Sequence, residues 1–312
     1  MARLLLIGNP SASSVTPRAR VVIAKALGAD HDVTVASTSR RGHATRLAQG
    51  AAADGTEVVV SLGGDGTVNE VANGLAGSDA ILGVLPGGST NVFARTIGMV
   101  NDPIEATGEL LSALAAGSTQ RIGLGSVNDR YFLFHVGIGL DAEVVRLVER
   151  QGQLKRWAGH PLFAWCGLQA WAQTYDRSRP RFAVRHPDGT VVDDAVFGLC
   201  QNSNPYTYLG NRPLCTNPNA GLDRPLAMLS FRDLDLLPTL RYLTESLLGG
   251  DRLVRDARVV ERHDLERLTI TGHGPFPYQV DGDHLGDAER LDLAWVPDVL
   301  TLVVPRPTDA QG

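Results

Sequence analysis

The sequence has little cysteine and no long apolar run. Its three cysteines, Cys166, Cys200 and Cys215, are too far apart for a metal or disulfide motif. Such sparse cysteine is typical of a reducing compartment, so we expect a cytoplasmic protein. No stretch approaches the roughly 20 apolar residues of a membrane-spanning helix. The first apolar run stops at Asn9-Pro10, which favours a buried strand over a secretion signal.

Positive charge is also scarce. The 312 residues carry a net charge of −5, so the chain as a whole lacks the basic surface typical of nucleic-acid binding. Lys25 and Lys155 are its only lysines, and no segment matches the phosphate-binding pattern G-x-x-x-x-G-K-[ST]. A content of 43% hydrophobic and 20% charged residues is ordinary for a soluble globular protein of one or two domains.

The first third of the sequence alternates strand and helix patterns. The predicted strands are "RLLLIG", "DVTVAS", "EVVVSL" and "AILGVL", with amphipathic or glycine-terminated helical segments between them. This order predicts an α/β domain with a parallel doubly wound sheet. From about residue 126 the sequence changes to short β-like runs separated by turns, which predicts a second, mostly antiparallel β domain.

A polar or glycine-rich turn follows each of the first four strands. These turns are "GNPSASS", "STSRRGHA", "GGDGT" and "PGGSTN". Because the carboxyl ends of parallel strands lie along one edge of a sheet, we expect the four turns to converge on one ligand site.

The turn "GGDGT" has the composition of an anion site. Gly63, Gly64 and Gly66 allow the backbone to approach a phosphate closely, and a helix N-terminus attracts negative charge. Thr67 can cap the helix or donate to a phosphate oxygen. Asp65 would repel a bare phosphate, so we expect it to contact a magnesium ion bound to the phosphates. The alternative is a tight turn in which Asp65 is a structural cap.

The turn "PGGSTN" is of the same kind. Gly88 precedes Ser89 and Asn91, whose side chains hydrogen-bond phosphate or cap a helix. Arg95 lies one turn into the following helix, where it could bind an anion or pair with Glu70. A plain connection would not require two such turns at one sheet edge.

The segments "GGDGTVNEVANGL" and "PGGSTNVFAR" resemble the signature loops of the diacylglycerol kinase catalytic domain family, which includes bacterial lipid kinases and the sphingosine and ceramide kinases. "GNPSAS", "TSRRGHATRLA", "GIGLDAEVV" and "VDGD" resemble further motifs of this family, from about residue 7 to 283. Gly-Gly-Asp-Gly alone also occurs in NAD kinases, but Asn69-Glu70 directly after the loop disfavours an NAD kinase.

The resemblance implies an NAD kinase/diacylglycerol kinase-like fold. Residues 1–125, with about 292–312 returning, would form the nucleotide-binding domain, and residues 126–291 a β-sandwich domain for the lipid. ATP would donate its γ-phosphoryl group, with Mg²⁺, to a lipid hydroxyl. The residues placed around the nucleotide by motif position or loop chemistry are Asn9, Thr38, Gly63, Gly64, Gly66, Thr67, Gly88, Ser89 and Asn91. Glu70 and Arg95 would support the loops.

Two acids near the end of the chain are the candidate base. "YQVDGDHLGD" places Asp281 and Asp283 two residues apart, so both share a face if the segment is extended. Asp283 occupies the position of the base in the family, where a longer glutamate is frequent, and Asp281 would orient the loop. The alternative is an Asp-Gly hairpin turn with solvated acids.

The chain departs from the family pattern at acids that bind a structural metal in some members. Gly123 stands in "IGLG" where an aspartate is usual, Val92 replaces the aspartate after Asn91, and "NAGLD" retains Asp223. We therefore expect this second metal site to be lost. The missing acids also leave open a nucleotide-binding protein without kinase activity.

The stretch from Lys155 to Trp171 is helical and rich in aromatic residues. Its tryptophans either pack inside the protein or dock on a membrane surface, where a lipid substrate would be met. The polar segment "QNSNPYTYLGN" is a cleft loop or a turn. The sequence leaves the substrate open among diacylglycerol, a sphingoid base, phosphatidylglycerol and a polyprenol, and it leaves a homodimer open.

Overall fold

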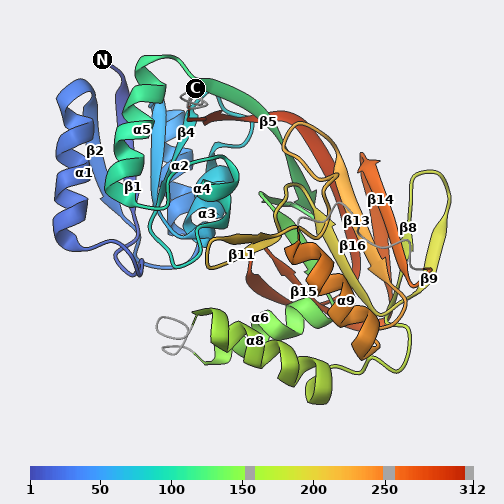
Figure 1. The fold of residues 1–312 in the computed structure, drawn as a ribbon. Helices are drawn as coiled ribbons and strands as arrows, with labels where there is room; N and C mark the ends of the chain where they lie inside the picture. Colours follow the sequence, from blue (N-terminus) through green and yellow to red (C-terminus); the bar gives the residue numbers. More distant parts are fainter. Residues whose placement is uncertain (152–158, 249–256, 306–312) are drawn as a thin grey trace, which may run out of the picture. The chain divides into compact units, whose positions relative to one another are not determined.

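The computed structural model describes residues 1–151, 159–248 and 257–305. The chain forms two compact units (Figure 1). Unit 1 consists of Met1–Ile122 and the chain from Asp298 on, and unit 2 consists of Gly123–Pro297.

Unit 1 is built around parallel strands in the order β2-β1-β3-β4, and the end of β16 pairs parallel with β4. Helices α1 and α5 pack together on one face of this sheet, and α2 and α3 on the other (Figure 1). The predicted parallel doubly wound sheet is confirmed. Its elements are β1 (Arg3–Gly8), α1 (Pro17–Asp30), β2 (Asp32–Ser37), α2 (His43–Ala53), β3 (Val58–Gly63), α3 (Asp65–Leu75), β4 (Ile81–Pro86), α4 (Val92–Thr96) and α5 (Pro103–Ala115).

Local signals explain where two of these helices begin. Thr16 accepts the backbone N–H of Ala19 at the start of α1, and Asp102 accepts those of Ile104 and Glu105 at the start of α5. A proline follows each cap, as is usual for the first helical position. Helix α5 was not among the predicted elements, although Asp102-Pro103 is such a start signal.

Unit 2 consists mainly of antiparallel strands around an apolar core that includes Phe182, Met228, Ile270 and Phe276. Its antiparallel pairing was predicted and is confirmed. The strands are β5 (Thr119–Val127), β6 (Arg130–Phe132), β7 (His135–Ile138), β8 (Phe182–Arg185), β9 (Val191–Ala195), β10 (Phe197–Gln201), β11 (Thr207–Leu209), β12 (Arg212–Leu214), β13 (Leu226–Phe231), β14 (Val259–Leu265), β15 (Arg267–Val280) and β16 (Asp283–Val303). The first residues of β5 and the last of β16 belong to unit 1.

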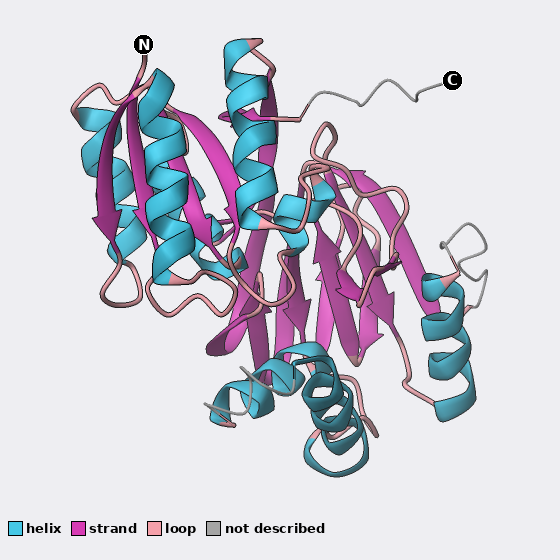
Figure 2. Ribbon diagram, turned by 60° about the vertical axis from the view of Figure 1, so that its left-hand side comes forward, coloured by secondary structure: helices cyan, strands magenta, loops and turns pink. Residues whose placement is uncertain are grey.

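Helical segments lie beside the strands of unit 2 (Figure 2). They are α6 (Leu140–Arg150), α8 (Gly159–Gln169), the π-helix η1 (Ala170–Thr174) and α9 (Leu236–Leu247). Leu147 and Val148 of α6 pack against Leu162 and Cys166 of α8. The predicted helix around Lys155 to Trp171 is thus present from Gly159 on, while Lys155 and Trp157 lie outside the described residues. No helix in the described part of the chain is long and apolar enough to cross a membrane.

Candidate functional site

The two glycine turns of unit 1 lie against each other at the carboxyl ends of β3 and β4. The backbone N–H of Gly87 donates to the carbonyl of Gly63 at 2.8 Å. A Cβ atom added to Gly88 would lie only 2.7 Å from the Cα atom of Gly64, so a side chain there would push the turns apart. Glycine is therefore required for this close backbone contact.

The turns after β1 and β2 lie at the same edge as the two glycine turns. Asn9 donates through Nδ2 to the Thr67 hydroxyl at 3.2 Å, and its backbone N–H donates to Leu62. The Ser14 hydroxyl donates to the carbonyl of Gly88 at 2.8 Å. Thr38, after β2, donates its N–H to Gly8 at 2.9 Å. The structure thus brings together the four turns that the sequence places at one edge.

Helix α3 starts at this edge and supplies the chemistry for binding an anion. Gly64 precedes the helix and has no side chain that could cap it. Gly64 and Gly66 are partly exposed and Ser89 is exposed. An eleven-residue helix with bare glycines at its N-terminus offers backbone N–H groups and partial positive charge to a phosphate.

Asp65 links the two glycine turns. Its Oδ2 accepts the N–H of Val92 at 3.0 Å and its Oδ1 accepts that of Phe93 at 2.9 Å, so the carboxylate caps α4. Burial raises the pKa of Asp65, while these backbone donors act in the opposite direction. Asp65 therefore has a structural role as a cap, which is the alternative to metal binding that its sequence context left open.

The protein itself supplies few ligands for a magnesium ion at Asp65. Each carboxylate oxygen accepts one backbone donor, which leaves each oxygen one lone pair for a further ligand. Among the described residues, no group of three or more His, Cys, Asp or Glu side chains could hold a metal. At Gly123, where the resemblance leads one to look for an acid, a Cβ atom would collide with the Trp295 indole, so the packing leaves no room for an acidic side chain.

Two more predicted residues support the loops from within. Asn91 is buried and has a positive φ of 51°; its Oδ1 accepts the N–H of Gly88 at 2.7 Å, and its Nδ2 donates to the Gly88 carbonyl and to Asn101. Glu70 accepts the N–H groups of Gly42 and Ala44 at 2.7 and 3.0 Å, at the start of α2. Glu70 thus holds the turn after β2. Arg95 lies in the last turn of α4.

The candidate base region of unit 2 is a two-residue hairpin between β15 and β16. Asp281 and Gly282 have φ angles of 49° and 83°, as a type I′ turn requires, and Val280 pairs with Asp283. The expectation of an extended segment, with both acids on one face, is therefore wrong: the Asp-Gly turn redirects the chain between them. The hairpin alternative is correct, but Asp281 is buried rather than solvated.

The two acids have different surroundings. The Asp281 carboxylate accepts three backbone N–H groups, from Leu133 at 2.7 Å and from Phe134 and His135 at 3.0 Å. Asp283 remains partly exposed, with its Oδ2 2.9 Å from Nη2 of Arg130. Asp281 therefore fixes the hairpin, whereas the Asp283 side chain is 21% exposed.

We expect Asp281→Ala to destabilise unit 2 by about 3 kcal/mol, because buried N–H groups that lose their acceptor cost 1–3 kcal/mol each. Urea unfolding followed by tryptophan fluorescence measures this change. Asp223→Ala, at an exposed acid, serves as the control and should alter stability by less than about 0.5 kcal/mol. If the two variants are equally stable, the Asp281 carboxylate does not stabilise the hairpin.

A buried polar cluster behind this hairpin was not predicted. The Asp141 carboxylate accepts the Tyr206 hydroxyl and the Gln279 side-chain amide, and Nε2 of His135 lies 3.9 Å from it. Burial lowers the pKa of His135 to about 4, although Asp141 acts to raise it, so His135 is neutral at pH 7. No local pattern in the sequence marks this cluster; in the structure Gly137 leaves room for Asp141, because a Cβ atom there would collide with the carboxylate.

Gln279 connects this cluster to the hairpin. Its Nε2 donates to Asp141, and its Oε1 accepts the N–H of Gly282 at 2.8 Å. Tyr206 and Asn202 belong to the polar segment "QNSNPYTYLGN", and Asn202 donates to the carbonyls of Gly123 and Leu133. The segment that the sequence left unassigned therefore supports the positions around Asp283.

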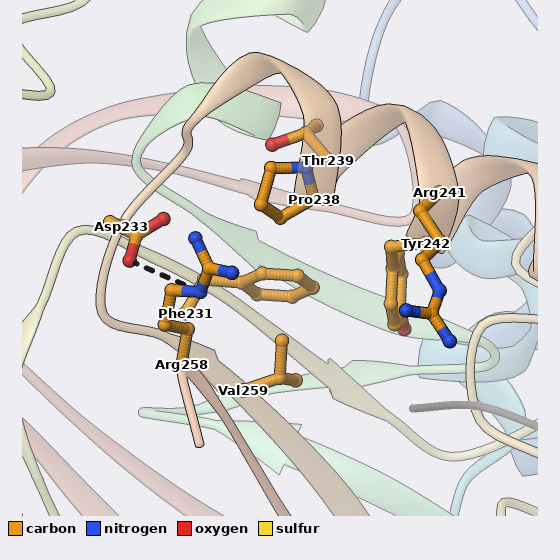
Figure 3. Close-up of a pocket in the computed structure, with 8 residues that line it drawn as sticks. All are labelled: Phe231, Asp233, Pro238, Thr239, Arg241, Tyr242, Arg258 and Val259. Carbon is orange, nitrogen blue, oxygen red and sulfur yellow. Dashed lines mark ion pairs between the residues drawn. The ribbon is translucent and has the colours of Figure 1, made fainter. Parts of the chain in front are cut away.

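A pocket at the start of α9 lies apart from these residues (Figure 3). Its volume of about 20 Å³ holds little more than a water molecule. Arg258 and Asp233 form an ion pair of 3.9 Å across its rim. No predicted site residue lines it, and we assign it no function.

Comparisons with known proteins show the family and the fold. The diacylglycerol kinase catalytic domain model matches residues 3–127. A Chromohalobacter salexigens protein named "Probable lipid kinase YegS-like" is 32% identical over 94% of this chain and 90% of its own length. The Bacillus subtilis diacylglycerol kinase is 34% identical over 45% of this chain and 46% of its own. A solved diacylglycerol kinase structure from Bacillus anthracis shares the fold, with a TM-score of 0.71, 21% identity and coverage of 98% and 97%.

The architecture of the two units and these similarities define a protein of the diacylglycerol kinase-like fold. The chain belongs to the diacylglycerol kinase family that includes the YegS-like lipid kinases.

Proposed function

We propose that the protein is an ATP-dependent lipid kinase that transfers the γ-phosphoryl group of ATP, supplied with Mg²⁺, to a lipid hydroxyl such as that of diacylglycerol. The observation that carries this proposal is the glycine edge of unit 1. The two glycine turns contact each other through their backbones, and α3 starts between them. A site of this kind suits a polyphosphate better than a neutral ligand. The names of the relatives support a lipid as the acceptor.

In this proposal the residues of the chain act mainly by positioning. The N–H groups at the start of α3 and the Ser89 hydroxyl hold the phosphates, and the links from Asp65 and Asn91 keep the two turns together. The Asp283 carboxylate accepts the proton of the lipid hydroxyl as its oxygen attacks the γ-phosphorus. ADP leaves with the electrons of the broken P–O bond.

The second candidate is a nucleotide-binding protein without kinase activity. It is favoured by the commitment of Asp65 to α4 and by the absence, among the described residues, of a metal-binding cluster. A thermal shift with ATP would occur under both proposals. Transfer of labelled γ-phosphate to extracted lipids, followed by a panel of single lipids, occurs only with the kinase. Labelling of NAD instead would contradict both.

We also propose that the protein associates peripherally with the membrane through α8. No charged residue occurs from Gly159 to Gln169, and Phe163, Trp165 and Leu168 are exposed there. Leu237 and Leu240 of α9 are likewise exposed. An exposed apolar helix with a tryptophan suits the interface of a bilayer, where a lipid substrate is met.

The two tryptophans of this region are expected to behave differently. Trp165 is 63% exposed, whereas Trp171 donates Nε1–H to Leu234 at 2.9 Å and packs under Arg177. We expect Trp165→Ala to weaken sedimentation with lipid vesicles several-fold without changing the melting temperature. Trp171→Ala should instead lower stability by about 3 kcal/mol. If Trp165→Ala binds vesicles as well as the parent protein, α8 is not the docking helix.

A further inference from the structure

Arg130 forms an ion pair with the candidate base. It is the first residue of β6, and its Nη2 lies 2.9 Å from Oδ2 of Asp283. The two side chains are 28% and 21% exposed, so the pair is partly shielded from solvent. Ion pairs near the surface add little to stability. Stability alone therefore does not account for this contact, and its place beside Asp283 points to the reaction.

The backbone on both sides of Arg130 is fixed. Asn128, in the turn before β6, donates its N–H to the Asp292 carbonyl at 2.9 Å, and its Oδ1 accepts the N–H of Asp292 at 3.2 Å. After β6, the N–H of Leu133 donates to Asp281 at 2.7 Å. The short strand that carries Arg130 is thus attached to β16 before it and to the Asp281-Gly282 hairpin after it. A backbone held in this way suits a side chain that must meet a reacting group.

The proposed reaction brings the transferred phosphoryl group close to this arginine. A base lies about 2.6–3.2 Å from the hydroxyl oxygen whose proton it accepts. That oxygen lies about 3–3.5 Å from the γ-phosphorus just before it attacks. If Asp283 is the base, the γ-phosphoryl oxygens therefore lie within a few ångströms of its carboxylate. Arg130 contacts the same carboxylate, and a guanidinium can bind two acceptors at once through its planar fork.

The chemistry also requires positive charge at this point. During transfer, negative charge is spread over the three outer oxygens of the phosphoryl group. The two glycine turns of unit 1 offer N–H and hydroxyl donors to the phosphates, but neither turn contains a lysine. A cation beside the base would supply the charge at the group that moves. Arg130 has the charge, the donors and the position for this role.

We propose that Arg130 is a catalytic residue that binds the oxygens of the transferring phosphoryl group while Asp283 accepts the proton of the lipid hydroxyl. The hydroxyl oxygen forms a bond to the γ-phosphorus. The bond from this phosphorus to the β,γ-bridging oxygen breaks, and its electron pair leaves on ADP. The guanidinium stays charged throughout and then contacts the phosphate of the lipid product. This inference rests on the proposed lipid kinase activity.

Initial rates with labelled ATP and dioctanoylglycerol test the proposal. If the panel of single lipids selects another acceptor, that lipid and its phosphate take the place of dioctanoylglycerol and its product. Arg130→Ala should lower the rate at saturating substrate roughly 100-fold, because an arginine on a transferring phosphoryl group can contribute 10³-fold or more. Arg130→Lys, which keeps the charge without the fork, should recover part of the rate, as should millimolar guanidinium added to Arg130→Ala. Arg232→Ala breaks a 2.9 Å ion pair with Asp194 in the same unit and is the matched control, with the parent rate expected.

Binding of the lipid product separates this role from a structural one. Arg130→Ala should weaken the binding of dioctanoyl phosphatidic acid about tenfold in titration calorimetry, because a charged donor to the phosphate is lost. Asp283→Ala removes a negative charge and should bind this product at least as tightly as the parent protein does. If Arg130 only holds Asp283 in place, the two variants would bind the product alike, and combining them would cause no further loss of transfer.

The outcomes also separate this inference from the proposed function. Transfer at the parent rate by Arg130→Ala, or unchanged binding of the product, would overturn the role of Arg130 while the kinase stands. A parent protein that labels no lipid would overturn the proposed function, and this inference with it. Arg130→Ala and Arg232→Ala should melt at the same temperature, so that a lost rate reflects the reaction and not the fold.

Discussion

Asp283→Ala is expected to lower the rate of phosphoryl transfer to lipid at least 100-fold, while the affinity for ATP stays unchanged. The reason is that a positioned general base contributes roughly 10²–10⁴-fold to such a step. Asp283 is the acid of the hairpin that remains accessible, since the Asp281 carboxylate is committed to three backbone donors. Initial rates with labelled ATP and an ATP thermal shift measure the two quantities.

Two variants sharpen this experiment. Asp283→Glu should retain or raise activity, because it keeps the carboxylate and places it one carbon farther out. Asp287→Ala, at an exposed acid on the same strand, is the matched control and should transfer at the parent rate. If Asp283→Ala also turns over lipid at the parent rate, the base lies elsewhere.

The elements of unit 1 were predictable because their signals are local. Strands such as "EVVVSL" are short apolar runs, and each is followed by a glycine or polar turn. In a parallel sheet these turns must meet at one edge, so the grouping of Asn9, Gly64 and Gly88 followed from topology alone. The hairpin at Asp281-Gly282 is likewise visible in the sequence as an Asp-Gly signal.

The hydrogen-bond partners of the structural acids were not predictable. Asp65 binds residues 92 and 93, and Asp281 binds residues 133–135, far away in the sequence. The same holds for Asp141, whose partners Tyr206 and Gln279 come from distant strands and loops. A carboxylate that caps backbone groups and one that binds a ligand have the same local sequence, and only the packed structure separates them.

This distinction decides the expected effect of Asp65→Asn. The carboxylate accepts two backbone N–H groups of α4, whereas an amide offers one oxygen and turns its NH₂ group toward the other donor. One buried donor then loses its acceptor, at a cost of about 2 kcal/mol. We expect lower thermal stability, and a loss of ATP affinity and turnover, because the two glycine turns are no longer held together.

Melting temperatures with and without Mg²⁺, before ATP is added, separate this role from metal binding. Asp79→Asn, at an exposed acid near the end of α3, is the control and should melt with the parent protein. If Asp65 is a cap, Asp65→Asn melts lower than both, and Mg²⁺ alone stabilises none of them. If Asp65→Asn instead melts with the parent, and its lost turnover returns as Mg²⁺ is raised, then the carboxylate serves a magnesium site and the cap contributes little. The cap predicts that stability and turnover fall together, because one pair of hydrogen bonds holds both the fold of α4 and the shape of the phosphate-binding edge.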